Sequence, residues 1–223
     1  MPGRKTPLVT DEIYHVFNRG INRQPTFITK WGFQRAVESI DFYRFNKPPA
    51  SFSAFLRLDR EKRTEMLKFL QTKNVLVEIF AFCLMPNHFH FLLKQRVDGG
   101  LSKFMSNFQN SYTRYFNTKH ERDGSLFLDQ FKAVRIEDDE QFLHVSRYIH
   151  LNPHTGYVVK TLGELEKYPW SSFPSYLDDN SNNFIKKDFL LAFFKTADKY
   201  KQFVFDQADY QRYLKKIQHL ILE

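Results

Sequence analysis

Two histidines separated by one residue, His88 and His90, follow a tight turn at 85–87. The flanking segments 75–84 and 88–94 are rich in β-branched and aromatic residues, which is typical of paired buried strands. Because side chains alternate between the faces of a strand, both imidazoles project from one face, about 7 Å apart at the backbone. Imidazole is a common ligand of divalent metals, so the pair indicates a metal site. Core packing is the alternative that the pair alone leaves open.

A second group of polar side chains lies in the segment 138–152, whose apolar residues recur with helical spacing. Tyr148 and Asn152 are four residues apart, which places them one turn apart on the same helix face. His144 lies one turn before Tyr148 and is a candidate proton acceptor. Pro153 restricts the residue before it, so we expect the helix to end at Asn152. A half-buried packing role with a satisfied hydroxyl is the alternative for Tyr148.

The elements that would position these residues follow from the remaining periodicity. Strand patterns cover 12–19, 75–84, 88–94 and 125–136, and helical patterns cover 29–46, 101–118 and 138–152. Pro48 and Pro49 are expected to end the first helix, and a charged amphipathic segment at 50–73 predicts a short inserted helix. The order predicts an α+β fold: a ferredoxin-like split βαβ antiparallel sheet with an added C-terminal helix that carries Tyr148.

Composition suggests one main domain with an extension. We expect a catalytic domain at 1–177, with an insertion at about 47–74, and a helical C-terminal extension at 178–223 packed on it. The polar run DDNSNN at 178–183 is the best linker by composition.

The charge balance indicates the class of partner. The 223 residues include 33 Lys and Arg against 25 Asp and Glu, a formal net charge of +8, which favours polyanions such as nucleic acid. The single cysteine, Cys83, excludes a disulfide framework and a Cys-rich zinc site. No run reaches the ~18 apolar residues of a membrane span, and the first residues lack a signal-peptide core. We therefore expect a cytoplasmic protein with no membrane association.

Several motifs together resemble one family. AFCLMPNHFHFLLKQ at 81–95 and SRYIHLNP at 146–153 are similar to the motifs of single-tyrosine HUH transposases, and within them to the REP-associated tyrosine transposases. Further matching segments are YHVFNRGINRQPTF at 14–27, NSYTRYFN at 110–117, SLFLDQFKAVRI at 125–136 and WSS at 170–172. The resemblance covers most of residues 12–177.

The resemblance implies a function and a site. His88 and His90 would bind a catalytic metal, Mg²⁺ or Mn²⁺, with help from Asn152, where many relatives carry glutamine. Tyr148 would be the nucleophile of a DNA endonuclease and strand transferase that acts in DNA transposition and recombination. It would cleave single-stranded DNA near hairpins, including repetitive extragenic palindromes, through a 5′-phosphotyrosine. The chain would act as a monomer or a homodimer.

Basic residues near this motif set are candidates for DNA binding, because Lys and Arg neutralise phosphates. They are accompanied by an asparagine at a glycine corner, and the predicted set is Asn18, Arg19, Arg23, Arg114 and Lys132. A solvated surface is the alternative for each cation. Two other functions stay open: a catalytically inactive ferredoxin-like nucleic-acid-binding module, and a nickase of the replication-initiator or relaxase type.

Overall fold

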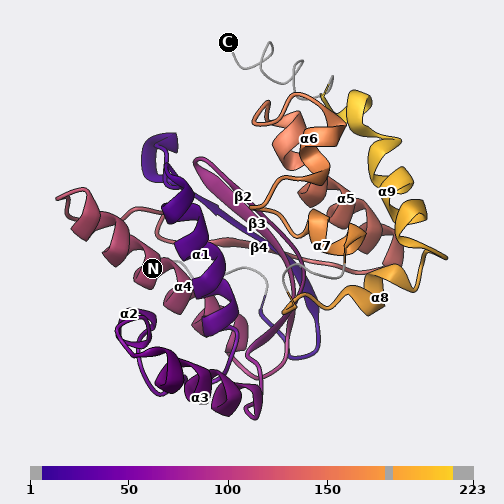
Figure 1. Ribbon diagram of the computed structural model, residues 1–223. Coiled ribbons are helices and arrows are strands. Elements are labelled where there is room, and N and C mark those ends of the chain that lie inside the picture. The colour runs from indigo at the N-terminus through magenta and orange to yellow at the C-terminus, as the bar shows by residue number, and fades with distance from the viewer. Residues whose placement is uncertain (1–6, 179–182, 213–223) are drawn as a thin grey trace.

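The structure, a computed structural model, describes residues 7–178 and 183–212. Its centre is a four-stranded antiparallel sheet in the order β2-β3-β1-β4 (Figure 1). The strands are β1 (Ile13–Arg19), β2 (Val77–Met85), β3 (His88–Gln95) and β4 (Lys132–Arg135). This order, with helix 30–43 and the inserted helices between β1 and β2 and helix 100–119 between β3 and β4, is the ferredoxin-like arrangement, so the predicted α+β fold class is confirmed.

One face of the sheet is closed by α1 (Lys30–Tyr43) and α4 (Gly100–Lys119). Phe89 and Phe91 on β3 point to this face, and their ring centroids lie 5.4 and 5.7 Å from that of Phe108 on α4. The alternation of β3 therefore anchors its two phenylalanines in the core. The same alternation turns His88 and His90 to the other face.

The second face is covered by α5 (Asp139–Thr155), which packs on β2 and β3. Phe142 of α5 meets Phe80 of β2 edge to face, with ring centroids 5.3 Å apart. Over the other half of the sheet this face is open, and Val134 on β4 is 49% exposed. The boundary between the covered and the open half runs along β3 and β1.

Short helices continue the layer of α5 on this side of the sheet (Figure 1). They are α6 (Leu162–Glu166), α7 (Phe173–Leu177), α8 (Lys187–Leu191) and α9 (Ala197–Phe205). The WSS segment binds the edge of β2, because the Ser172 amide donates to Phe82 and the Leu84 amide donates to Trp170, at 2.9 and 2.8 Å. The buried His150 ring joins α5 to the extension through Tyr200 Oη at 2.6 Å. The division at residue 177 stays a prediction.

The inserted segment contains two helices, α2 (Phe52–Phe55) and α3 (Arg60–Gln71), where we expected one short helix. Asp59 separates them, and its side chain caps α3 by accepting from the Lys62 amide at 2.9 Å. The preceding helix α1 begins after Thr29, whose side chain accepts from the Gly32 amide, and ends at Tyr43, before the prolines. Its end is set by strand-like pairing, since the Leu76 amide donates to the Arg44 carbonyl at 2.6 Å.

Two further boundaries differ from the prediction. The last strand comprises only 132–135 of the expected 125–136, because the chain before it bends: the Leu128 amide bonds to Arg19 at 3.0 Å. Helix α5 passes through Pro153 and ends at Thr155, so the predicted end at Asn152 is wrong. Proline only biases its predecessor, and here residues 151–155 are all buried, so packing holds the helical geometry.

Candidate active site

His88 and His90 converge on one face of β3 as predicted, with ring centroids 5.1 Å apart. His88 Nδ1 lies 2.6 Å from Asn87 Oδ1, and His88 Nε2 lies 3.3 Å from Asn152 Oδ1. An asparagine side-chain oxygen thus faces each ring nitrogen of His88.

This donor set fits a divalent cation. Metal–ligand bonds of about 2.1 Å bring neighbouring ligands about 3.0–3.4 Å apart, which matches the separation of His88 Nε2 and Asn152 Oδ1. Asn87 would then accept the Nδ1 proton, an outer contact typical of metal-bound histidine. Among residues 7–178 and 183–212, no group of three or more His, Cys, Asp or Glu side chains is arranged to hold a metal. The candidate ligands are thus two imidazoles and an amide.

His15 on β1 lies beside this pair, although its position in the sequence suggested no role. Its Nε2 is 3.0 Å from His90 Nδ1, and the two rings stack with centroids 5.2 Å apart. Burial lowers the pKa of His15 to about 4, so its ring is neutral at pH 7. Neutral His15 can accept a proton from His90 Nδ1, which directs the lone pair of His90 to Nε2.

Tyr148 completes the arrangement from helix α5. Its ring centroid lies 5.3 Å from that of His90 and 5.9 Å from that of His15, both edge to face. The side chain is 40% exposed, whereas Asn152 one turn later is 1% exposed. Burial of part of the ring raises the pKa of Tyr148, against a hydrogen bond with Asn152 that lowers it. The phenol is accordingly protonated at neutral pH and needs an acceptor to become a nucleophile.

A groove of about 730 Å³ gives access to these residues. Three cations among the predicted DNA contacts line it, Arg19, Arg23 and Lys132, together with His88, His90 and Tyr148, and among the residues that the structure describes no Asp or Glu does. The lysine of β4 and the arginines at the end of β1 therefore surround the phenol with positive charge. Such a groove suits an anion that approaches Tyr148.

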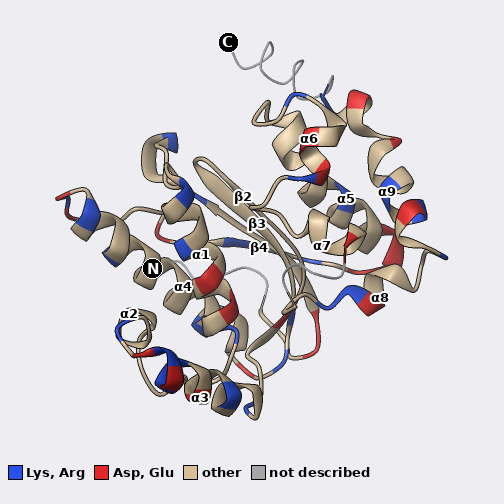
Figure 2. Cartoon of the chain, in the orientation of Figure 1, with Lys and Arg blue, Asp and Glu red and all other residues tan. Residues whose placement is uncertain are grey.

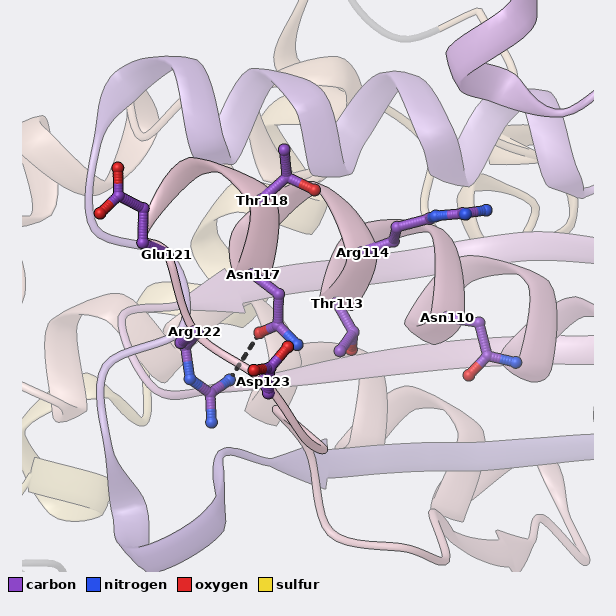
Figure 3. A pocket seen from close by; sticks show the side chains of 8 residues that line it. All are labelled: Asn110, Thr113, Arg114, Asn117, Thr118, Glu121, Arg122 and Asp123. Atoms are coloured by element: carbon purple, nitrogen blue, oxygen red, sulfur yellow. Dashed lines mark hydrogen bonds between the residues drawn. The ribbon is translucent and has the colours of Figure 1, made fainter.

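Two predicted DNA contacts are placed differently. Arg114 lies on α4, on the opposite side of the sheet, and lines other pockets (Figure 3). Asn18 borders the groove but is 5% exposed; its Nδ2 donates to the Leu128 carbonyl and its Oδ1 accepts from the Arg19 amide, both at 2.9 Å. The candidate proton acceptor His144 has its Nε2 3.6 Å from Glu140 Oε1 and does not line the groove.

The signal for His15 was present in the strand pattern. In β1 the buried residues Tyr14 and Val16 alternate with His15, Phe17 and Arg19. Arg19 pairs with His88, and Phe17 pairs with His90, across the β1–β3 ladder. His15 therefore shares a face with the histidine pair, which the sequence reveals only once that register is known.

In the part of the chain that the structure describes, we find no helix with the length and apolar character of a bilayer span.

Comparison with known proteins gives a family-model match and similar solved structures. Residues 54–152 match the family model described as "Transposase IS200 like". The fold is similar to that of a REP-associated tyrosine transposase solved with a bound REP hairpin, at a TM-score of 0.55 and 14% sequence identity. That match covers 84% of this chain and 98% of the other. No curated protein matches the chain in sequence.

The family match spans α3, the β2–β3 hairpin with both histidines, α4 and α5 as far as Asn152. It therefore includes Tyr148 together with the predicted metal ligands, while β1, α1 and the segment after α5 lie outside it. Over residues 54–152 the chain is similar to the IS200-like transposase family, and its fold is similar to that of a REP-associated tyrosine transposase.

Proposed function

We propose that this protein is a metal-dependent endonuclease and strand transferase for single-stranded DNA, with Tyr148 as the nucleophile. The observation that carries the proposal is the approach of Tyr148 to the histidines of the same chain, with 5.3 Å between the ring centroids of Tyr148 and His90 in a basic groove. Because one chain supplies all of these side chains, a monomer would have a complete site. We place the reaction in the cytoplasm, which suits a chain with a single, buried cysteine.

His88, His90 and Asn152 would hold Mg²⁺ or Mn²⁺, which when bound polarises a non-bridging phosphate oxygen and favours ionisation of a nearby phenol. Asn87 and His15 would fix the orientation of the two imidazoles through their Nδ1 atoms. Arg19 and Lys132 would hold the phosphates on either side of the cleaved bond.

Cleavage would follow from attack of the Tyr148 oxygen on phosphorus. The phenol releases its proton to a solvent acceptor, the Oη–P bond forms, and the P–O3′ bond breaks, so that the upstream strand leaves with a protonated 3′-hydroxyl. The downstream strand stays attached through its 5′-phosphate. A 3′-hydroxyl can then attack the phosphotyrosine and restore both the diester and the phenol. The ester bond is conserved throughout, so joining needs no ATP.

The substrate we propose is a single strand next to a DNA hairpin. The structurally similar REP-associated tyrosine transposase is bound to a REP hairpin, and the groove here combines cations with the exposed ring of Tyr148. A flexible single strand can present its diester to a phenol at the base of a groove more readily than a rigid duplex can.

The test is a covalent adduct on a denaturing gel. A hairpin oligonucleotide with an unpaired flank, labelled at its 3′ end, should migrate with the protein after incubation with Mn²⁺, and a 5′ label should appear on a shortened free strand. A second strand with a 3′-hydroxyl should then attack the phosphotyrosine and be joined to the protein-bound, 3′-labelled fragment, which frees the protein. Binding without any adduct would favour the inactive nucleic-acid-binding module, and nicking without joining would favour the replication-initiator type of enzyme.

A further inference from the structure

A second basic groove lies on the other side of the sheet, between α1, α2 and α4, which Figure 1 shows grouped there. Its volume is about 940 Å³. In the described part of the chain, no Asp or Glu lines it and four cationic side chains do: Arg35 from α1, Arg57 after α2, and Arg114 and Lys119 from α4. We call it the α4 groove. Ser51, Ser53 and Arg57 come from the inserted segment, so the α4 groove exists because of the insertion.

No carboxylate forms an ion pair with these cations in the described residues, although Glu38 on α1 raises the pKa of Arg35 against the lowering by burial. By contrast, Arg135 Nη2 lies 2.7 Å from Glu12. Like charges around one groove repel one another and create a positive potential. An anionic ligand that spans the groove would relieve that repulsion.

Arg35 forms a fixed part of this surface. Its guanidinium carbon lies 4.4 Å from the ring centroid of Phe52 and 5.4 Å from that of Tyr115, and its Nη2 donates to Ser53 Oγ at 2.8 Å. Partial burial lowers the pKa of Arg35. Because the ordinary pKa of arginine lies far above neutral pH, the guanidinium still stays charged. These contacts join the insertion to α1 and α4 and hold a cation in place before any ligand arrives.

The chemistry of the lining favours phosphates over bases. Phe52 and Tyr115 are already engaged by Arg35, so they do not provide the free ring faces on which unpaired bases stack. Beyond the cations, α4 supplies amides and hydroxyls, the groups that commonly contact the sugar–phosphate backbone: Asn107, Asn110, Ser111 and Thr118.

The basic character is confined to this flank of α4. On its other flank a separate pocket includes Glu121 and Asp123, and Arg122 Nη1 donates to Asn117 Oδ1 at 2.8 Å (Figure 3). Figure 3 shows the side chain of Arg114 pointing away from both carboxylates. Arg114 is thus free to serve the α4 groove, which explains its position far from Tyr148.

We propose that the α4 groove binds the phosphodiester backbone of DNA outside the segment that is cleaved, without reading its sequence. This inference rests on the proposed function only in taking DNA as the ligand. Such a second contact would hold the substrate while its single-stranded part occupies the groove of Tyr148. Each phosphate contact displaces about one cation from DNA, so it adds about one to the dependence of log Kd on log salt.

The test measures DNA binding in the Tyr148→Phe background, so that cleavage does not enter. Fluorescence anisotropy with a hairpin oligonucleotide, repeated from 50 to 300 mM salt, gives Kd and its salt slope. Arg57→Ala combined with Arg114→Ala should weaken binding about tenfold or more at 100 mM salt and lower the slope by about two. Replacing both arginines by lysine keeps the charge and should leave both quantities near their original values.

The matched control removes two cations that are already paired. Arg135→Ala with Lys62→Ala changes net charge equally, but these side chains pair with Glu12 and Asp59. The proposal requires that this control change affinity less than threefold, and that thermal unfolding show both double variants folded. Unchanged binding in the Arg57/Arg114 variant, or an equal loss in the control, would overturn it. Failure of adduct formation by the Tyr148 protein would instead count against the proposed function and leave this result standing.

Discussion

The two basic grooves differ in what lies beneath their cations. In the groove of Tyr148, Arg19 and Lys132 surround two histidines and a phenol that the sheet and α5 bring into ring contact. In the α4 groove, Arg57 and Arg114 surround hydroxyls, amides and an arginine stacked on aromatic rings. Both grooves attract anions, but among the residues that the structure describes only the first brings a phenol into ring contact with two histidines.

The comparison shows that positive charge by itself does not indicate a catalytic site. Strands place side chains at fixed two-residue intervals, and a ladder brings those of neighbouring strands within hydrogen-bond distance. The outer surface of α4 offers long side chains that reach into solvent, with no second layer to fix them. Catalysis needs fixed groups, whereas phosphate binding tolerates mobile ones.

The largest effect should come from Tyr148→Phe. Loss of the nucleophilic oxygen should reduce cleavage by about a thousandfold or more, while DNA affinity stays within threefold because the phosphate contacts remain. Denaturing gels and anisotropy measure the two quantities on one preparation. Tyr210→Phe is the control, since Tyr210 is 60% exposed and distant from the groove lining. Normal cleavage by Tyr148→Phe would remove the chemical difference between the two grooves.

The second-largest effect on cleavage should come from removing the metal with a chelator. EDTA should lower cleavage about a hundredfold or more, and Mg²⁺ or Mn²⁺ should restore it, because the ion stabilises charge that develops on the phosphate. The contribution of the α4 groove to affinity should persist in EDTA, since its contacts use side-chain cations only. We would measure single-turnover cleavage and anisotropy in parallel. Cleavage that resists the chelator would refute the metal role of His88 and His90.

His15→Ala should have an intermediate effect. Without the Nε2 acceptor, His90 loses the contact that fixes its tautomer, so the Mn²⁺ midpoint for cleavage should rise about 10- to 100-fold. His15→Gln retains an acceptor oxygen and should recover most of that loss. Mn²⁺ binding without DNA, followed by electron paramagnetic resonance, gives a second readout that does not depend on activity.

The control for this prediction is His120→Ala, because His120 packs on Phe116 with ring centroids 4.4 Å apart and lies outside the groove. If the Ala and Gln variants of His15 lost equal cleavage activity while the Mn²⁺ midpoint stayed unchanged, His15 would have a packing role only.

Local periodicity was enough to predict most of the fold and the two central parts of the site. A period of two placed His88 and His90 on one face, and a period of 3.6 placed Tyr148 one turn from Asn152. These relations lie within single elements, so no tertiary information is needed. The ferredoxin-like order followed because each strand and helix has its own apolar pattern, although α5 continues past Pro153 under the influence of packing.

Contacts between different helices and strands could not be predicted from local periodicity. His15 meets His90 only through the register of β1 on β3. Arg114 faces away from Tyr148 because the apolar stripe of α4 is buried on the far side of the sheet. The bend before β4, where the Leu128 carbonyl accepts a hydrogen bond from Asn18, cannot be predicted from the amino-acid composition of that segment. In each case the deciding partner is distant in sequence.

Asn18 gives the smallest effect on DNA binding and the sharpest test of how the groove of Tyr148 is built. It was predicted to contact DNA, but its amide closes the bend between β1 and Leu128. Asn18→Ala should lower the free energy of unfolding in urea by about 1–3 kcal/mol, because the Leu128 carbonyl and the Arg19 amide each lose a hydrogen-bond partner. The salt slope should not change. Lys132→Ala should do the opposite, lowering the slope by about one with stability within about 0.5 kcal/mol. A weaker salt dependence of DNA binding in a fully stable Asn18→Ala protein would instead mean that Asn18 contacts DNA. Polar side chains, and not only charged ones, would then bind DNA at the rim of this groove.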